Sequence, residues 1–371
     1  MSVAVDAEPP HPFDPAEQPL GAFGRAAHVL ATTVIAVVLL PLRVLLLLIL
    51  ALCSLIACSL CMGRADRRAA PAPLVTSHRV IGRLGLLALG VWPGLLTVNG
   101  RQEGAPVLLA APHCGSLDAF FFLMAGMARP VALAPYARLP LVGMLFRAAR
   151  GIAVPLSAAP AMPPSCRSAK VAASPLLTEA RNDHATSETN GSVGAEGGGA
   201  TTQKPSATHA VRAAILEHKR QFDAAAGDKP IVLFPEGTTH SGRALLTFFS
   251  GGFVGGSAVQ PVLLQYPYRH LNSACYLTTL PAHVCRLLLS PWVVMRVTFL
   301  PTYSPSPEEA DDPELMAENV RALMAKALGV PLSTIGAREL RREAAAGRNG
   351  QRGSSDAEQR SHDSTKAKDG V

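Results

Sequence analysis

Charged and aromatic residues are scarce in this sequence. Only 16% of the 371 residues are charged and 5% are aromatic, yet the formal net charge is +7 and the pI is near 9.2. A surface that binds nucleic acid combines basic residues with aromatic rings on which bases stack, and no stretch of the chain has that pattern. We therefore exclude nucleic acid as a partner, and the positive charge points to phosphate-bearing ligands or an acidic membrane surface.

Matched cysteine pairs are also lacking. The seven cysteines are scattered, and no Cys-x-x-Cys pair is accompanied by a second one. This excludes a disulfide framework and the usual structural zinc sites, so we expect no metal. Cys53, Cys58 and Cys61 lie within an apolar run and are predicted to be reduced and buried. Palmitoylation of Cys58 or Cys61 is the alternative.

That apolar run, residues 28–62, contains Arg43 as its only charged residue besides His28. As one straight helix it would be about 50 Å long, whereas a bilayer core is about 30 Å thick. Pro41 interrupts helical hydrogen bonding, and an arginine at mid-bilayer costs roughly 2.5–3.5 kcal/mol. We predict a membrane-embedded helical hairpin, bent or re-entrant, or else a kinked span whose Arg43 extends to the interface.

The arginines at positions 64, 67 and 68 follow this run directly. Positive charge beside a membrane segment favours the cytosolic side, so we expect the remainder of the chain there. Residues 79–96 form a second apolar stretch, which is short and rich in glycine. We predict that this stretch is an interfacial helix leading into a globular domain.

A pattern of alternating strands and helices begins near residue 107. Short β-branched runs predict strands, and helical periodicity predicts helices between and after them. The predicted strands are 107–111, 231–234, 259–266 and 293–300, and the predicted helices are 116–127 and 313–328. Asp312 and Gly329 are expected to cap the last helix. This order predicts an α/β fold with a mixed, mainly parallel sheet flanked by helices.

Changes in composition divide the chain into segments. A stretch rich in Ala, Ser, Thr and Gly is predicted to be a low-complexity insertion, because loop closure becomes costly only slowly as a loop lengthens. Both ends are polar and are predicted to be disordered. The expected segments are a disordered N-terminus at 1–24, membrane-embedded and interfacial helices at 25–98, a catalytic domain at 99–335 with the insertion at 157–208, and a disordered tail at 336–371.

Two motifs carry residues suited to chemistry. His113 and Asp118 are five positions apart across a predicted strand-to-helix turn, where the carboxylate can orient the imidazole as a general base. After a later strand comes Phe-Pro-Glu236-Gly237-Thr238, in which glycine allows close approach of a ligand and Glu and Thr offer polar groups. Taken singly, the first motif could be a surface histidine with a helix-capping aspartate, and the second an ordinary turn.

Together and in this order, the motifs resemble those of the glycerolipid acyltransferase superfamily, an H-x4-D block followed by an FPEGT block. The strings at 41–48, 247–253, 259–267 and 299–330 are similar to the lysophosphatidylcholine acyltransferase branch. The similarity covers about residues 28–335, apart from the insertion. The resemblance implies transfer of an acyl group from acyl-CoA to the free hydroxyl of a lysophospholipid at a membrane, with no cofactor and no covalent enzyme intermediate.

The resemblance also implies roles for single residues. His113 would take the proton from the acceptor hydroxyl and Asp118 would orient His113, while Glu236, Gly237, Thr238 and Arg243 would bind the acceptor. The chain departs from the family pattern at four positions: Leu156 replaces an arginine, Phe249 and Ser250 replace Lys-Pro, and Arg243 lies one position from the usual arginine. Two explanations are open for Leu156: Arg147 or Arg150 supplies the lost charge, or the insertion has displaced the motif.

The remaining histidines and Cys114 have simpler interpretations. Adjacent residues rarely face each other, so Cys114 is expected to pack rather than to act as a nucleophile with His113. His240 is expected to be a solvated turn residue. His78, His270 and His283 have no spacing typical of metal ligands and are expected to be structural or exposed.

The resemblance thus implies an acyltransferase at a membrane of the endoplasmic reticulum, and the arginines after the apolar run place its catalytic domain on the cytosolic face. Its partners would be acyl-CoA, a lysophospholipid and the bilayer, and the oligomeric state is not indicated. Three alternatives remain: a lysophosphatidic acid or glycerol-3-phosphate acyltransferase, a thioesterase that uses the same histidine, and a non-catalytic lipid-binding protein.

Overall fold

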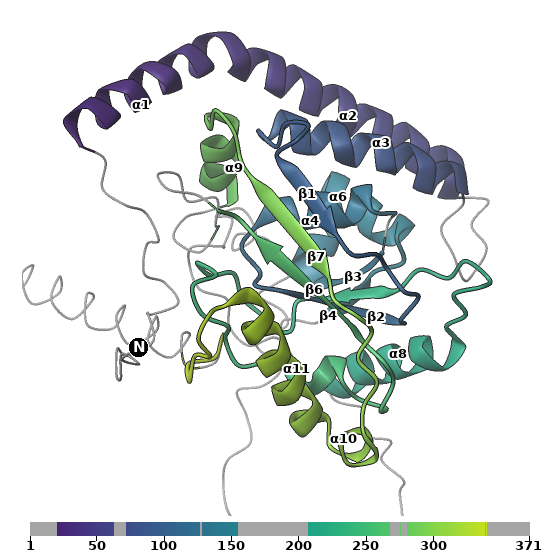
Figure 1. Ribbon diagram of the computed structural model, residues 1–371. Coiled ribbons are helices and arrows are strands. Elements are labelled where there is room, and N and C mark those ends of the chain that lie inside the picture. The colour runs from purple at the N-terminus through teal and green to yellow at the C-terminus, as the bar shows by residue number, and fades with distance from the viewer. Residues whose placement is uncertain are drawn as a thin grey trace, which may run out of the picture.

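The computed structural model describes residues 21–62, 72–126, 128–154, 207–267, 275, 280–337 and 339 (Figure 1). This description leaves out nearly all of the predicted insertion and most of both predicted disordered ends. It also leaves out the side chain of Cys61, Leu156, His270 and the three arginines after the apolar run. Residues 22–24, assigned to the disordered N-terminus, form the first helical turn. Ala337, assigned to the tail, is buried, so the packed domain extends slightly further than predicted.

A seven-stranded sheet is the centre of the fold. Its strands are β1 (Leu96–Asn99), β2 (Val107–Ala111), β3 (Arg129–Leu133), β4 (Ile152–Val154), β5 (Ile231–Leu233), β6 (Gln260–Gln265) and β7 (Met295–Phe299). Their order is β1-β7-β6-β2-β5-β3-β4, and every neighbouring pair is parallel except β6 with β7. The predicted mixed, mainly parallel α/β sheet is therefore confirmed.

Helices cover both faces of the sheet because its central strands are apolar on both sides. On β2, Leu108 and Ala110 face one core, and Val107, Leu109 and Ala111 face the other. The first core includes α3 (Ala72–Ala88), α4 (Ser116–Met124) and α9 (Leu280–Leu288), and the second includes α8 (Ala207–Gln221) and α11 (Pro313–Leu328). The short helices α5 (Ala134–Ala137), α6 (Pro140–Ala148) and α10 (Pro307–Asp311) complete the domain.

The caps predicted for α11 are present. The Asp312 carboxylate accepts hydrogen bonds from the N–H groups of Glu314 and Leu315, at 2.9 and 3.0 Å. Gly329 ends the helix in the left-handed conformation at φ 69°. Both features satisfy backbone groups that a helix leaves unpaired at its ends, which is why they can be read from sequence.

The N-terminal apolar run is one bent helix rather than a helix that folds back on itself. It comprises α1 (Ala22–Val34), a π-helical turn (Ile35–Leu39) and α2 (Leu40–Met62). The π-helical turn immediately precedes Pro41, whose missing N–H and bulky ring disturb the α-helical bonding pattern. The separate helix α3 packs along α2 (Figure 1). His78 on α3 lies 2.8 Å from the Ser54 hydroxyl on α2, and both are buried.

The helix predicted at 79–96 begins and ends earlier, at 72 and 88. Gly90 adopts φ 93°. Its N–H donates a hydrogen bond to the carbonyl of Leu87, and the N–H of Val91 donates to the carbonyl of Leu86. This Schellman arrangement terminates the helix, so that Leu96 can begin β1. The glycines of α3 serve close packing, since a Cβ at Gly82 would lie 2.6 Å from the backbone of Met124 on α4.

Arg43 points into the protein and not toward a membrane interface, so the alternative of an Arg43 that extends outward is wrong. Its guanidinium is buried and donates hydrogen bonds to the carbonyls of Leu288 and Ser290, both at 2.7 Å. An arginine within an apolar helix is stable here because these carbonyls replace water.

The side of the α1–α2 helix that faces away from the domain is apolar and is not covered by other described residues. The stretch Ala22–Leu60 is long and apolar enough to cross a membrane, and only 18% of its most apolar part is buried. A core helix of a soluble protein would be largely covered, so this surface indicates membrane association. Its exposed large side chains are Phe23, Val29, Leu30, Val34, Val37, Val38, Leu42, Val44, Leu45, Leu48, Ile49, Leu52, Leu55, Ile56 and Leu60.

Candidate active site

Three neighbouring parallel strands bring the predicted motifs together. β5 and β6 flank β2 and run in the same direction, so the carboxyl ends of all three strands lie at one edge of the sheet. His113 follows β2, Phe234 and Glu236 follow β5, and Tyr266 follows β6. Residues more than 100 positions apart in the sequence thus meet in one site.

His113 and Asp118 form the predicted pair, with 2.7 Å between Nδ1 and Oδ2. Asp118 is fully buried, and its Oδ2 also accepts hydrogen bonds from the N–H groups of Cys114 and Gly115, at 3.0 and 3.1 Å. The Tyr266 hydroxyl donates to Oδ1. An acceptor-only carboxylate surrounded by donors requires a proton on His113 Nδ1. The lone pair of Nε2 is then free to take a proton from a hydroxyl.

One face of the His113 ring packs against Phe234, and part of the side chain is exposed to solvent. It stacks on the Phe234 ring with 3.9 Å between centroids, and 23% of its side chain is exposed. Phe234 is the first residue of the FPEGT block, so this block supports the base directly. The buried Asp118 and the partly exposed His113 give the arrangement of a general base facing solvent or substrate.

Glu236 is fully buried next to the backbone of His113. Its Oε2 accepts the backbone N–H of His113 at 2.9 Å, and its Oε1 accepts from His240 Nε2 at 2.8 Å and from the Leu246 N–H at 3.1 Å. Both carboxylate oxygens are engaged by the protein. Glu236 therefore holds the backbone of the turn that carries His113, and these contacts differ from the acceptor contact that the resemblance implies.

His240 is buried, so the expectation of a solvated turn histidine is wrong. Its Nδ1 accepts the N–H of Gly242 at 3.2 Å, which leaves the proton on Nε2 for the bond to Glu236. Its own N–H donates to the carbonyl of His113 at 3.0 Å. These bonds connect the FPEGT loop to both sides of the His113 backbone.

The other predicted acceptor-binding residues lie on the outer side of the FPEGT loop. Gly237 is exposed with φ 67°, Thr238 is half-buried and Arg243 is exposed. Within the part of the chain that the structure describes, the Arg243 guanidinium has no hydrogen bond or ion pair. The Phe249 ring lies over Gly237, where a Cβ would come within 2.4 Å of it. The ring excludes any larger residue than glycine there.

Neither Arg147 nor Arg150 is placed to supply the charge missing at position 156. β3 and β4 are parallel to β2 through β5, and Arg150 precedes β4. It therefore lies at the amino edge of the sheet, opposite the edge that carries His113. Its carbonyl accepts a hydrogen bond from Arg129 Nε at 3.0 Å. Arg147, on the helix before this turn, is exposed.

Cys114 is a buried packing residue, as predicted. Burial, with the nearby carboxylates of Asp118 and Glu236, raises the pKa of its thiol well above the usual range. A neutral buried thiol is a poor nucleophile. The geometry therefore assigns no nucleophilic role to Cys114.

Tyr266 and His283, which the sequence did not assign to the site, hold the turn that carries His113; His283 is structural, one of the two expectations for it. Tyr266 follows a predicted strand at the same edge as His113, and this position is the signal that could have identified it. His283 is fully buried on α9, with Nε2 3.1 Å from the Ser116 hydroxyl. Burial and then the charge of Arg286 lower the pKa of His283 to about 4. No local sequence pattern could have assigned His283 to this site, because its partner Ser116 is 167 positions away in the sequence.

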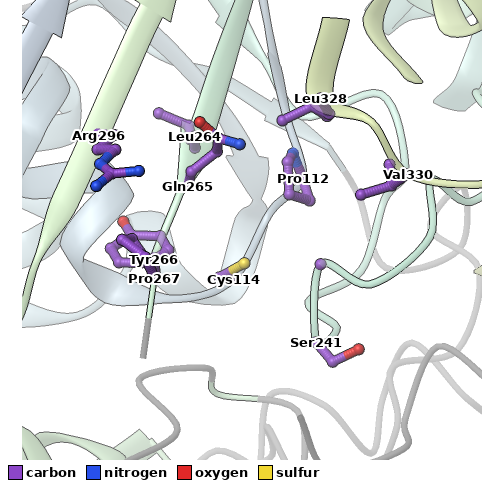
Figure 2. Close-up of a pocket in the computed structure, with 11 residues that line it drawn as sticks. Pro112, Cys114, Ser241, Leu264, Gln265, Tyr266, Pro267, Arg296, Leu328 and Val330 are labelled. Atoms are coloured by element: carbon purple, nitrogen blue, oxygen red, sulfur yellow. The ribbon is translucent and has the colours of Figure 1, made fainter. Parts of the chain in front are cut away.

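Open space lies directly against the catalytic turn. A cavity of about 190 Å³ is bordered by Pro112 and Cys114 of that turn and by Ser241 of the FPEGT loop. Figure 2 shows it between Arg296 on β7 and Val330 beyond α11. Among the described residues, no three His, Cys, Asp or Glu side chains are grouped so that they could hold a metal ion.

No family model matches the sequence. The chain is 31% identical over 243 residues to the lysophospholipid acyltransferase LPCAT4 of Homo sapiens, covering 64% of this chain and 37% of that protein. It is 28% identical to lysophosphatidylcholine acyltransferase 2 of Homo sapiens, covering 70% and 39%, and 41% identical to the lysophospholipid acyltransferase LPEAT1 of Arabidopsis thaliana, covering 34% and 32%. The chain thus spans between 32% and 39% of the length of these curated relatives.

Among solved structures, the chain is similar to the 1-acyl-sn-glycerophosphate (LPA) acyltransferase PlsC of Thermotoga maritima. The TM-score is 0.41 at 14% identity, covering 79% of this chain and 98% of that one. The resemblance inferred from the H-x4-D and FPEGT motifs is confirmed by the curated relatives: this chain is a homologue of lysophospholipid and lysophosphatidylcholine acyltransferases.

Proposed function

We propose that this chain is an acyl-CoA-dependent O-acyltransferase that esterifies the free hydroxyl of a lysophospholipid to give a diacyl phospholipid. The observation that carries the proposal is the His113–Asp118 pair. The Nδ1 of His113 is 2.7 Å from a fully buried carboxylate, and its ring is partly exposed. This geometry suits abstraction of a proton from a hydroxyl that enters the site from outside.

In the proposed reaction, His113 Nε2 takes the proton as the acceptor oxygen attacks the thioester carbonyl of acyl-CoA. The tetrahedral intermediate collapses, the C–S bond breaks, and the CoA thiolate takes the proton from the imidazolium. Asp118 stabilises the imidazolium that forms in between. No step requires a metal, a prosthetic group or an acyl-enzyme.

For the acceptor we propose lysophosphatidylcholine, by analogy with the names of the relatives. Lysophosphatidic acid and glycerol 3-phosphate are smaller and more anionic, and depend more on basic contacts. Phe249 and Leu156 stand where the family pattern has basic residues. Gly237, Thr238 and Arg243, on the outer side of the FPEGT loop, are proposed to bind the acceptor.

We further propose an endoplasmic reticulum membrane, with the catalytic domain on its cytosolic face. The apolar side of α1 and α2 supports attachment to a bilayer. A lysophospholipid could then reach His113 from the same membrane without passing through water.

The first test is CoA release by the purified protein in detergent, with oleoyl-CoA and a panel of lysophospholipids. Release that requires a lysolipid and is lost in His113→Ala supports the proposal and identifies the acceptor. Release without a lysolipid that is lost in the same variant indicates a thioesterase instead. A protein that binds phospholipid vesicles containing lysolipid but releases no CoA with any acceptor is a lipid-binding protein, and the proposal is then wrong.

A further inference from the structure

Helix α9 connects the apolar N-terminal helix to the catalytic turn. Its C-terminal end is bonded to α2 through Arg43, and its His283 side chain is bonded to the turn between His113 and Asp118 through Ser116. Figure 1 shows α9 close beneath the α1–α2 helix and on the same side of the sheet as α4. The proposed mechanism assigns no role to any of these contacts.

On the catalytic side, His283 packs tightly against the turn. Its Nε2 lies 3.1 Å from the Ser116 hydroxyl, and a Cβ added at Gly115 would lie 3.0 Å from the same nitrogen. Gly115 also donates its N–H to the Asp118 carboxylate. His283 therefore packs against the part of the turn whose backbone N–H groups hold Asp118.

On the membrane-helix side, Arg43 fixes the end of α9. The guanidinium donates to the carbonyls of Leu288, Ser290 and Pro291, at 2.7, 2.7 and 3.3 Å. Trp92 Nε1 donates to the Pro291 carbonyl as well, at 3.0 Å. A cation at the carboxyl end of a helix is favoured by the helix dipole, and charge-assisted bonds are stronger than neutral ones.

We propose that α9 is a positioning element that makes the alignment of His113 and Asp118 depend on the seating of α2 against the domain. Arg43 holds one end of α9 and His283 holds the catalytic turn from the other part of the same helix. Neither residue touches the reacting atoms, so both are positioning residues. This proposal rests on the proposed acyltransferase function for its kinetic test.

The kinetic test uses Arg43→Met, His283→Leu, the double variant and the matched control Leu42→Met, whose side chain is 60% exposed on α2. A displacement of about 1 Å can reduce a rate by roughly 100-fold, so we expect kcat to fall about 10- to 100-fold in either single variant with little change in KM. His283→Gln, which keeps a polar atom near Ser116, should restore most of kcat. The control should match the unaltered protein.

The double variant decides whether the two sites are coupled. If α9 transmits the effect, the double variant should be no slower than the slower single variant, because either change already releases the turn. Multiplicative losses would show two independent structural effects and would overturn the proposal. Arg43→Lys, which keeps the charge and loses the bidentate geometry, replaces Arg43→Met if that variant fails to fold.

Hydrogen–deuterium exchange provides a readout that does not require activity. The amides of Cys114 and Gly115 are bonded to Asp118, and they should exchange faster in Arg43→Met and in His283→Leu than in Leu42→Met. Unchanged exchange at these amides in the Arg43 variant would overturn the coupling. If the protein has no transferase activity, the proposed function fails, while the exchange data still decide the role of α9.

Discussion

The backbone N–H of His113 donates a hydrogen bond to Glu236 Oε2, with 2.9 Å between nitrogen and oxygen. The two motifs that are separated by 123 positions are therefore one structural unit. Glu236 accepts two further hydrogen bonds and is fully buried. The carboxylate of the FPEGT block thus holds the backbone of His113, the proposed base, in place.

Glu236→Gln should lower kcat and stability rather than weaken acceptor binding. A glutamine places an NH₂ group against at least one of the three donors that Glu236 accepts from, which are the N–H groups of His113 and Leu246 and Nε2 of His240. A buried donor left without an acceptor lowers the folding stability by about 1–3 kcal/mol. We expect a kcat reduced at least about tenfold and a lower melting temperature, with an unchanged KM for the acceptor. A raised acceptor KM with normal kcat and stability would instead identify Glu236 as a substrate contact. Thr238→Val, on the outer side of the loop, is the comparison.

Asp118→Asn should nearly abolish transfer while leaving the fold intact. An amide oxygen in the place of Oδ2 can still accept from His113 Nδ1 and from the two backbone N–H groups. The change nevertheless removes the negative charge that stabilises the imidazolium, and it places the NH₂ group against the Tyr266 hydroxyl. We expect kcat to fall by about 10³–10⁴-fold, measured as CoA release with a lysolipid acceptor. Circular dichroism should match the unaltered protein. Activity within tenfold of normal would exclude the proposed role of Asp118.

Cys114→Ala should retain activity. The thiol is buried, and burial with the Asp118 and Glu236 carboxylates raises its pKa. It is therefore protonated at neutral pH and cannot form an acyl-thioester efficiently. We expect kcat within about threefold of normal, since a small buried cavity costs stability more than rate. Loss of activity together with acyl transfer onto the unaltered protein would point to a covalent mechanism.

Acidification from pH 7 to pH 5 should destabilise the protein through His218 and His283. Burial lowers the pKa of both to about 4, and Arg129 donates a hydrogen bond to His218 Nδ1, which requires a neutral ring. In the unfolded chain they bind protons below about 6.5. Unfolding therefore takes up protons, and stability present above pH 6.5 is lost as the pH falls toward 4.

The expected loss is roughly 1–2 kcal/mol for each histidine at pH 5. Thermal melts between pH 7.5 and 5 should show it, and His218→Gln should flatten the pH dependence compared with the unaltered protein. Equal slopes for the two proteins would show that His218 is not a source of the acid sensitivity.

Charges placed on the uncovered side of α2 should release the protein from membranes. Leu48 and Leu52 are 63% and 57% exposed, so Leu48→Glu with Leu52→Glu removes apolar contact and adds repulsion toward acidic lipid without disturbing the packed side. We expect binding to sedimenting anionic vesicles to fall at least tenfold, with the melting temperature in detergent unchanged. Undiminished vesicle binding would show that this surface is not the attachment site.

Local physical rules explain what the sequence predicted well. Apolar runs in β2, β5, β6 and β7 imply buried strands, and the capping residues Asp312 and Gly329 satisfy backbone groups of their own helix. The His113–Asp118 pair is also local, because a short turn brings the two side chains together. The predicted end of α3 is wrong because the apolar stretch continues to residue 96, beyond the last helical residue. In the sequence, Gly90, which terminates the helix, cannot be told apart from the glycines inside α3, which allow close packing.

Long-range contacts explain the rest. The sequence by itself determined β2, β5, β6 and β7, the caps of α11, the apolar character of residues 28–62 and the proximity of His113 to Asp118, since each depends on neighbours a few positions away; it did not predict β1, β3 or β4. Only the tertiary structure decided that Glu236 and His240 are buried supports, that Arg43 faces inward and that Tyr266 and His283 hold the catalytic turn. Their partners lie on other strands and helices, and burial of a polar side chain depends on those partners.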